Sequence, residues 1–144
     1  MANKNKIDTI ERPMSPHLQV YKISFTMIMS MMHRISGFIL YLGSFLFLVW
    51  YLSIFFGQDA YNYVNQLFSL SIVKLALFLF TWIFFHHLFG GIRHFIWDIG
   101  LGFDLNSIEW LARLTILFSF ISASLLWVLS VSYTHLRAHE TQTH

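Results

Sequence analysis

Three long stretches without a charged side chain constrain the fold of this chain more than any other feature. The first holds 24 residues, 35–58, between Arg34 and Asp59, and as a helix it would be about 36 Å long. The hydrocarbon core of a bilayer is about 30 Å thick, so this stretch can cross it. The chain is 56% hydrophobic and 11% charged, whereas soluble domains are about 25% charged. The sequence therefore indicates an all-α integral membrane protein.

The other two stretches predict two further transmembrane helices. The second, between Lys74 and Arg93, has 18 residues and would be only about 27 Å long, so its helix must continue through the charged residues that follow. The third begins after Arg113 and extends towards Arg137. The predicted transmembrane helices cover about residues 31–56, 74–99 and 109–131.

Turn and cap signals predict the segments beside these helices. Gly100 and Gly102 should end the second helix, and Ser107 should be the N-cap of the third. Residues 57–73 should form a loop with a short interfacial helix, and residues 22–32 are compatible with a separate amphipathic surface helix.

Lysine and arginine are distributed unevenly around the predicted helices. They are dense before the first helix and after the second, and the loop between those helices has none before Lys74. The positive-inside rule then places the N-terminus in the cytoplasm and the start of the first helix beside the end of the second. Residues 1–22 contain Asp8 and Glu11 and lack the apolar core of a signal peptide, so we interpret them as a retained cytoplasmic segment of a bacterial inner-membrane protein.

The end of the chain differs abruptly from the rest. We place the membrane-anchor domain at residues 1–131 and a polar tail at residues 132–144, which contains three histidines. Two interpretations of the tail stay open: a disordered terminus, and foreign sequence, because SYTHLRAHET resembles translated sequencing-adapter read-through. A metal site is the weaker alternative, since no second cluster of ligands accompanies the histidines.

The first motif, SMMHRISG, lies at the start of the first predicted helix. Ser30, His33, Arg34 and Gly37 are spaced i, i+3, i+4 and i+7 and therefore share one helical face. A hydroxyl, an imidazole and a guanidinium can together hydrogen-bond a carbonyl and stabilise an anionic oxygen, and arginine can also bind a carboxylate such as a haem propionate. The alternative is that Arg34 only anchors the helix at the membrane surface.

The second motif, HHLFGGIRHFIWDIG, ends the second predicted helix. His87, Gly91, His94 and Asp98 share one face, and ionisable groups at membrane depth usually mark functional sites. Glycine lets a flat, bulky group approach the helix, and neutral imidazole is a good ligand for haem iron. The spacing leaves two interpretations of His87 open: it binds haem iron, with His94 placed to meet a propionate, or it hydrogen-bonds another helix, as a single membrane histidine more often does. His86 is rotated by about 100° on the helix, so only one of the adjacent pair should face the cofactor.

Haem held by two histidines would need a contribution from another chain. The third predicted helix has no histidine before His135, and His33 lies at the edge of the first. The second ligand must then come from a partner subunit. The absence of cysteine excludes thiolate ligation of an iron–sulfur cluster and cysteine-based haem attachment within this chain. A net charge of +2 is too small to argue for nucleic acid.

The two motifs resemble those of the cytochrome b556 subunits of succinate dehydrogenase, the larger membrane-anchor subunits of respiratory complex II. One matching region is residues 12–37, with Arg-Pro and then Ser-x-x-His-Arg-x-Ser; the other is residues 87–100, with His-x-x-x-Gly-Ile-Arg-His and then Trp-Asp-x-Gly. Together with the three helices, the resemblance covers about residues 10–131.

The resemblance implies a three-helix anchor that pairs with a second small anchor subunit and docks an iron–sulfur subunit and a flavoprotein subunit. Electrons from succinate would pass to ubiquinone, and haem b would be shared with the second anchor subunit. The chain would belong to an oxidoreductase without oxidising succinate itself. By residue, the resemblance makes His87 the axial haem ligand, places His33 and His94 near the haem propionates, and places Ser30, Arg34 and Asp98 at the quinone site.

Three alternative functions differ in the residues that they would require. A purely structural anchor without haem is disfavoured by the shared register of His87 and His94. A small transporter or channel subunit would need polar residues along the full depth of the helices, but their outer halves are almost entirely apolar. The anchor of a quinol:fumarate reductase stays open, because the direction of the reaction is set outside this subunit.

Overall fold

The structure of the protein is a computed structural model that describes residues 22–141, with side chains described as far as Tyr133. The described part forms four helices: α1 (Phe25–Ser53), α2 (Gln58–Ser69), α3 (Ser71–Asp98) and α4 (Leu105–Thr141). Three segments are long and apolar enough to cross a membrane, namely Phe25–Ser53, Ser71–Asp98 and Leu105–Tyr133. The predicted all-α membrane protein with three transmembrane helices is therefore confirmed.

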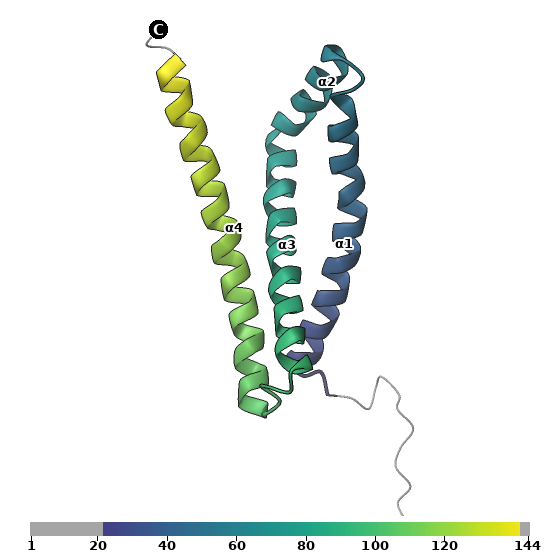
Figure 1. Cartoon of the computed structure of the whole chain (residues 1–144), viewed down its shortest axis with the longest axis vertical. Coiled ribbons are helices and arrows are strands. Elements are labelled where there is room, and N and C mark those ends of the chain that lie inside the picture. The colour runs from purple at the N-terminus through teal and green to yellow at the C-terminus, as the bar shows by residue number, and fades with distance from the viewer. Residues whose placement is uncertain (1–21, 142–144) are drawn as a thin grey trace, which may run out of the picture.

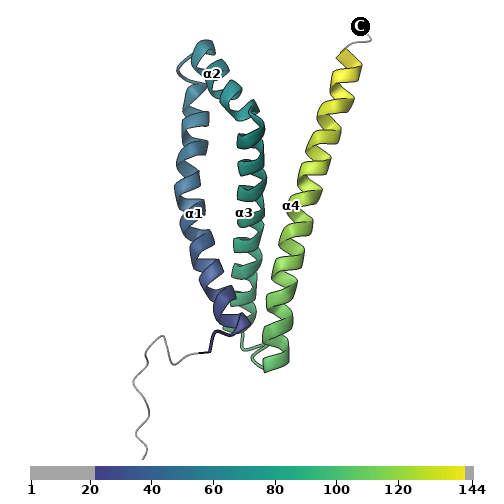
Figure 2. The ribbon, with the colours of Figure 1, turned by 180° about the vertical axis from the view of Figure 1, so that it is seen from behind.

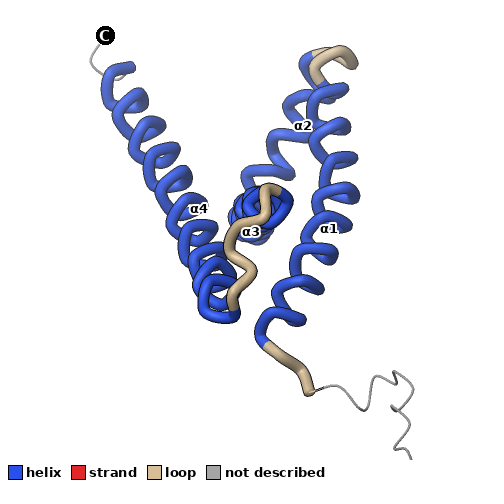
Figure 3. Tube along the Cα trace, turned by 60° about the horizontal axis from the view of Figure 1, so that its bottom comes forward, coloured by secondary structure: helices blue, strands red, loops and turns tan. Residues whose placement is uncertain are grey.

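The central helix of the molecule is α3, which lies between α1 and α4 (Figure 3). Helices α1 and α3 run antiparallel, and the short helix α2 joins them at one end (Figure 1). At the opposite end, the start of α1, the end of α3 and the start of α4 come together, and α4 diverges from α3 towards its C-terminus (Figures 1 and 2). The two sequence motifs therefore lie at the same end of the molecule, as predicted.

The first helix begins earlier than predicted. Ser24 is its N-cap and accepts a hydrogen bond from the Met27 backbone N–H at 3.3 Å. No glycine or proline interrupts residues 25–32, so the expected start near residue 31 and the separate surface helix at 22–32 are both wrong, and one continuous helix begins at Phe25. The short helix predicted within residues 57–73 is confirmed as α2.

Gly100 ends α3, as predicted. Its φ is 82°, and its N–H donates to Trp97 O at 2.9 Å while the Leu101 N–H donates to Ile96 O at 3.1 Å. This is the hydrogen-bond pattern of a Schellman motif, which favours glycine because the backbone is left-handed there.

The start and end of α4 both differ from the predictions. The Asp104 carboxylate accepts the Ser107 backbone N–H at 2.9 Å, so Asp104 caps the helix and the predicted N-cap, Ser107, lies inside it. Hydrogen bonds from the Ser107 side chain and backbone lower the pKa of the Asp104 carboxyl below its ordinary value. At its other end α4 continues to Thr141, past the expected end near residue 131.

Small residues bring α4 against α3. Four of them are at most 4% exposed and recur along one face of α4, namely Ala112, Thr115, Ser119 and Ala123. Such residues let membrane helices approach closely, and polar side chains then bond across the contact. Trp82 Nε1–H donates to Ser119 Oγ at 3.1 Å, and Trp127 Nε1–H donates to Thr81 Oγ1 at 3.2 Å. This packing fixes α3, which carries His87, His94 and Asp98.

Candidate functional site: a histidine cluster between α1 and α3

Three histidines gather where α1 meets α3. The rings of His33 on α1 and His87 on α3 are stacked, with centroids 4.2 Å apart and planes within 2° of parallel. His94, two turns further along α3, lies 5.0 Å from His33 by ring centroids. Within the described residues no group of three ligands has the geometry to hold a metal ion. The structure thus brings three predicted site residues together without forming a compact metal site.

Hydrogen bonds tie the two stacked rings to opposite backbones. His33 Nε2 lies 3.2 Å from the His87 carbonyl oxygen, and His87 Nδ1 lies 3.2 Å from the His33 carbonyl oxygen. A carbonyl oxygen can only accept, so each ring donates to the main chain of the other residue. Ser36 joins them, since its Oγ is 2.6 Å from the His33 carbonyl oxygen and 3.0 Å from His87 Nδ1. We call His33, Ser36 and His87 the histidine clasp.

Two glycines make the close approach possible. A Cβ at Gly90 would lie 2.3 Å from His33 Cδ2, and one at Gly37 would lie 2.9 Å from His87 Cε1. Around Gly91, which the sequence places on the face of His87 and His94, nothing lies within 4 Å of the Cβ position. Gly90 is therefore the glycine of this pair that admits the α1 side chain, and the approach of a flat group at Gly91 stays a prediction.

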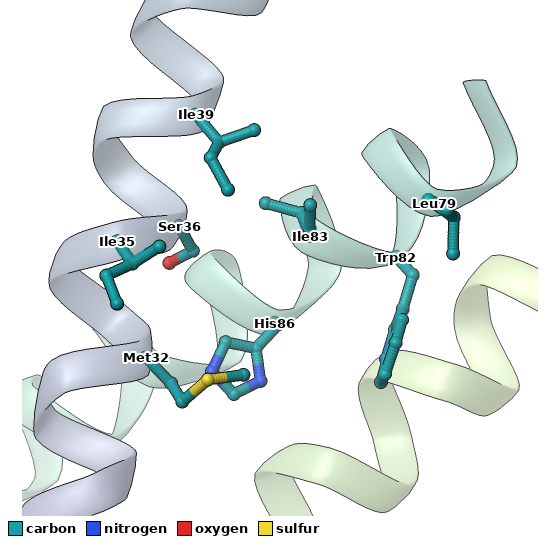
Figure 4. A pocket seen from close by; sticks show the side chains of 8 residues that line it. All are labelled: Met32, Ile35, Ser36, Ile39, Leu79, Trp82, Ile83 and His86. Carbon is teal, nitrogen blue, oxygen red and sulfur yellow. The ribbon is translucent and has the colours of Figure 1, made fainter. Parts of the chain in front are cut away.

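The most buried face of α3 carries a different set of residues from the predicted one. His86 and Arg93 are 6% and 4% exposed, and His86, Gly90 and Arg93 follow helical spacing. His86 helps to line a cavity of about 250 Å³ between α1 and α3 (Figure 4). Its Nε2 is buried and makes no hydrogen bond within the described part of the chain. The adjacent histidines thus have different surroundings: His87 contacts α1 backbone, and His86 faces an apolar cavity.

The predicted quinone residues lie outside the histidine clasp. Arg34 on α1 and Asp98 at the end of α3 are exposed, and Ser30 is half-buried. Asp98 and His94 help to line a shallow hollow beside Phe103. Among the hydrogen bonds and ion pairs of residues 22–133, none involves Ser30, Arg34 or Asp98. These three side chains therefore have no polar partner in the part of the chain that the structure describes.

Fold and cluster together define a class: a multi-pass membrane protein whose first and second spans are joined by imidazoles near one end. The family model for the succinate dehydrogenase/fumarate reductase transmembrane subunit matches residues 8–131, and the chain belongs to this family. The family inferred from the two motifs is confirmed.

Relatives agree with this assignment along most of the chain. The chain is 34% identical over 118 residues to the succinate dehydrogenase cytochrome b556 subunit of Rickettsia bellii (strain RML369-C), covering 82% of this chain and 92% of the relative. Identity to the subunit of the same name from Rickettsia prowazekii (strain Madrid E) is 36% over 118 residues, with the same coverage. For the Paracoccus denitrificans subunit it is 32% over 95 residues, covering 66% of this chain and 73% of the relative.

Proposed function

We propose that this chain is the haem-binding anchor subunit of a bacterial succinate:quinone oxidoreductase. The observation that carries the proposal is the state of His87. Its Nδ1 is held by the histidine clasp, while its Nε2 makes no hydrogen bond to any residue between 22 and 133. An imidazole held through one nitrogen and free at the other is suited to bind a metal.

The residues around His87 fit haem b. Bound there, haem would supply one-electron redox chemistry. His87 would be the axial ligand on this chain, and the second would come from the partner anchor subunit. His33 donates through Nε2 to the His87 carbonyl, so its role is to hold the helices and, with His94 and exposed Arg34, to meet propionates.

Quinone reduction is assigned to the unpaired side chains near the same end of the molecule. A quinone that accepts two electrons and two protons develops negative charge on its oxygens. Arg34 would stabilise that charge, and Ser30 would donate a hydrogen bond. Asp98, exposed at the end of α3, would complete the polar surroundings of the ubiquinone head group.

The distribution of positive charge supports the proposed assembly. The motif end of the molecule would face the cytoplasm of a bacterial inner membrane, because lysine and arginine concentrate there. An iron–sulfur subunit and a flavoprotein subunit would dock on that face, and the exposed apolar side chains of the helices would meet lipid and the second anchor subunit. The relatives named above are all succinate dehydrogenase subunits, which favours succinate oxidation over the fumarate reductase direction.

The adjacent histidines provide the test. In the purified complex, His87→Ala should abolish or strongly perturb the haem bands of the reduced-minus-oxidised difference spectrum, because the axial ligand is removed. His86→Ala is the matched control: it replaces the neighbouring histidine, which contacts the apolar cavity, and should retain the haem bands. A native spectrum in His87→Ala would contradict the proposal, and loss of haem only in His86→Ala would move the ligand to that residue.

A further inference from the structure

The buried hydroxyl of Ser36 is placed where it can control the chemistry of His87. Ser36 is 4% exposed, and its Oγ lies between the His33 carbonyl oxygen at 2.6 Å and His87 Nδ1 at 3.0 Å. These atoms come from both helices of the site, so one hydroxyl connects the α1 backbone to the α3 imidazole.

The position of each proton follows from what each atom can donate. The His33 carbonyl oxygen only accepts, so the short 2.6 Å contact takes the proton of the Ser36 hydroxyl. Towards His87, Ser36 Oγ therefore presents a lone pair. The His33 carbonyl also presents lone pairs to His87 Nδ1, at 3.2 Å. Since Nδ1 faces two acceptors, it must carry the ring proton.

A neutral imidazole has one N–H, so a proton on Nδ1 leaves a lone pair on Nε2. We propose that Ser36 is a positioning residue that selects this tautomer of His87 and so presents Nε2 to haem iron. This inference rests on the proposed haem-binding function and names a residue that orients the haem ligand.

The surroundings of the ring also fix its orientation. A rotation of the His87 ring by 180° would place Cδ2 against the two oxygens and lose both hydrogen bonds. The His33 ring, stacked at 4.2 Å, holds the plane of the His87 ring. Gly37 has no side chain, so the edge of the His87 ring can lie where a Cβ at that position would be only 2.9 Å away. Ser36 Oγ is the nearer of the two acceptors, so its removal should change the properties of the His87 ring.

An acceptor on Nδ1–H makes the opposite nitrogen more basic, which strengthens its bond to iron and favours the oxidised state. Ser36→Ala should therefore raise the midpoint potential of the haem and weaken haem retention, the latter by on the order of tenfold. Ser36→Thr keeps the hydroxyl and should restore both properties towards the wild type. A merely structural role for Ser36 would not shift the potential.

Ser44→Ala is the matched control on the same helix. Ser44 Oγ donates to the Tyr41 carbonyl at 2.6 Å, the same local bond as that of Ser36, but Ser44 is exposed and contacts no histidine in the described chain. Midpoint potentials would be measured by redox titration of the purified complex. Haem retention would be measured as the rate of haem transfer to excess apomyoglobin.

The proposal is supported when Ser36→Ala raises the potential and accelerates haem loss while Ser36→Thr and Ser44→Ala match the wild type. It is overturned when Ser36→Ala and Ser44→Ala behave alike. If Ser36→Ala does not assemble, the nearly isosteric Ser36→Cys takes its place, because a thiol is a weaker acceptor; a wild-type potential in that variant also overturns the proposal. Failure of the haem function is a separate result, since it appears as a native spectrum in His87→Ala.

Discussion

At the scale of single residues, the site combines side chains that hold one another with side chains that have no partner among the described residues. His33, Ser36 and His87 satisfy one another across two helices. Arg34 is exposed and has no partner among residues 22–133. A charge at a membrane boundary without a partner is poised to bind something from outside the chain. This contrast separates His87, which would bind haem iron, from Arg34, which would meet a propionate and act on quinone.

Replacing Arg34 tests the quinone assignment. Arg34→Ala in the assembled complex should lower succinate:quinone reductase activity by roughly 10²–10³, the usual cost of removing one donor to a developing oxyanion. Succinate oxidation by an artificial dye should be unchanged, because the dye takes electrons before the quinone site. Lys22→Ala removes another exposed cation just before the same helix and serves as the control. Unchanged quinone turnover in Arg34→Ala would remove Arg34 from the site.

At the scale of helices, α1 and α4 meet α3 in different ways. The contact with α4 is a row of small residues with tryptophan hydrogen bonds. The contact with α1 depends on glycines that receive aromatic rings: a Cβ at Gly43 would lie 2.0 Å from Phe80 Cε2, and Gly90 receives His33. The α1–α3 contact is thus sensitive to a single methyl group, because rings fill the space that a side chain would need.

Two adjacent glycines of α3 test this sensitivity. Gly90→Ala should destabilise the complex by about 1–3 kcal/mol, the usual cost of overpacking, because His33 is held by its stacking and hydrogen bond and cannot move away freely. Gly91→Ala has open space and should be neutral or stabilise the helix by up to about 1 kcal/mol. Thermal unfolding of the purified complex, followed by haem absorbance, would measure both. Equal midpoints for the two variants would show that the Gly90 contact is unimportant in the assembly.

Helical periodicity predicted which residues of α3 share a face, but not which of them contact α1. The spacing of His87 and His94 placed both on one face, and the structure brings both to His33. Adjacent residues differ by about 100° around a helix, so the pattern could not decide between Gly90 and Gly91 until the position of α1 was known. Ser36 was likewise present in the Ser-x-x-His-Arg-x-Ser motif, but its role depends on a ring from another helix.

At the scale of the whole molecule, the candidate site residues lie at one end. The start of α1, the end of α3 and the start of α4 meet there, while α2 closes the other end of the α1–α3 pair (Figure 1). The number of transmembrane helices could be predicted from hydrophobicity, because each of the three uncharged stretches corresponds to one helix. Gly100 could be predicted as the end of α3, but the start of α4 could not, because it depends on local competition: the Asp104 carboxylate accepts the Ser107 N–H and replaces Ser107 as the cap.

The absence of cysteine from the chain allows a direct test of topology. Single cysteines would be introduced as Gln58→Cys at the start of α2 and Asn106→Cys at the start of α4, both exposed positions. With the N-terminus in the cytoplasm, a membrane-impermeant maleimide should label the first in intact cells and the second only in inverted vesicles. The reverse pattern would place the site on the opposite side of the membrane and exclude docking of cytoplasmic subunits over it.

The histidine clasp also has a consequence for how the chain can diverge. Besides the Ser36 hydroxyl, its acceptors are the main-chain carbonyls of His33 and His87, which every amino acid possesses. Substitutions can therefore remove the imidazole donors or the Ser36 hydroxyl, but they cannot remove the two carbonyl acceptors. A lineage that loses one imidazole keeps the opposite half of the contact intact, and a single reversion at that codon would restore the junction of the two helices.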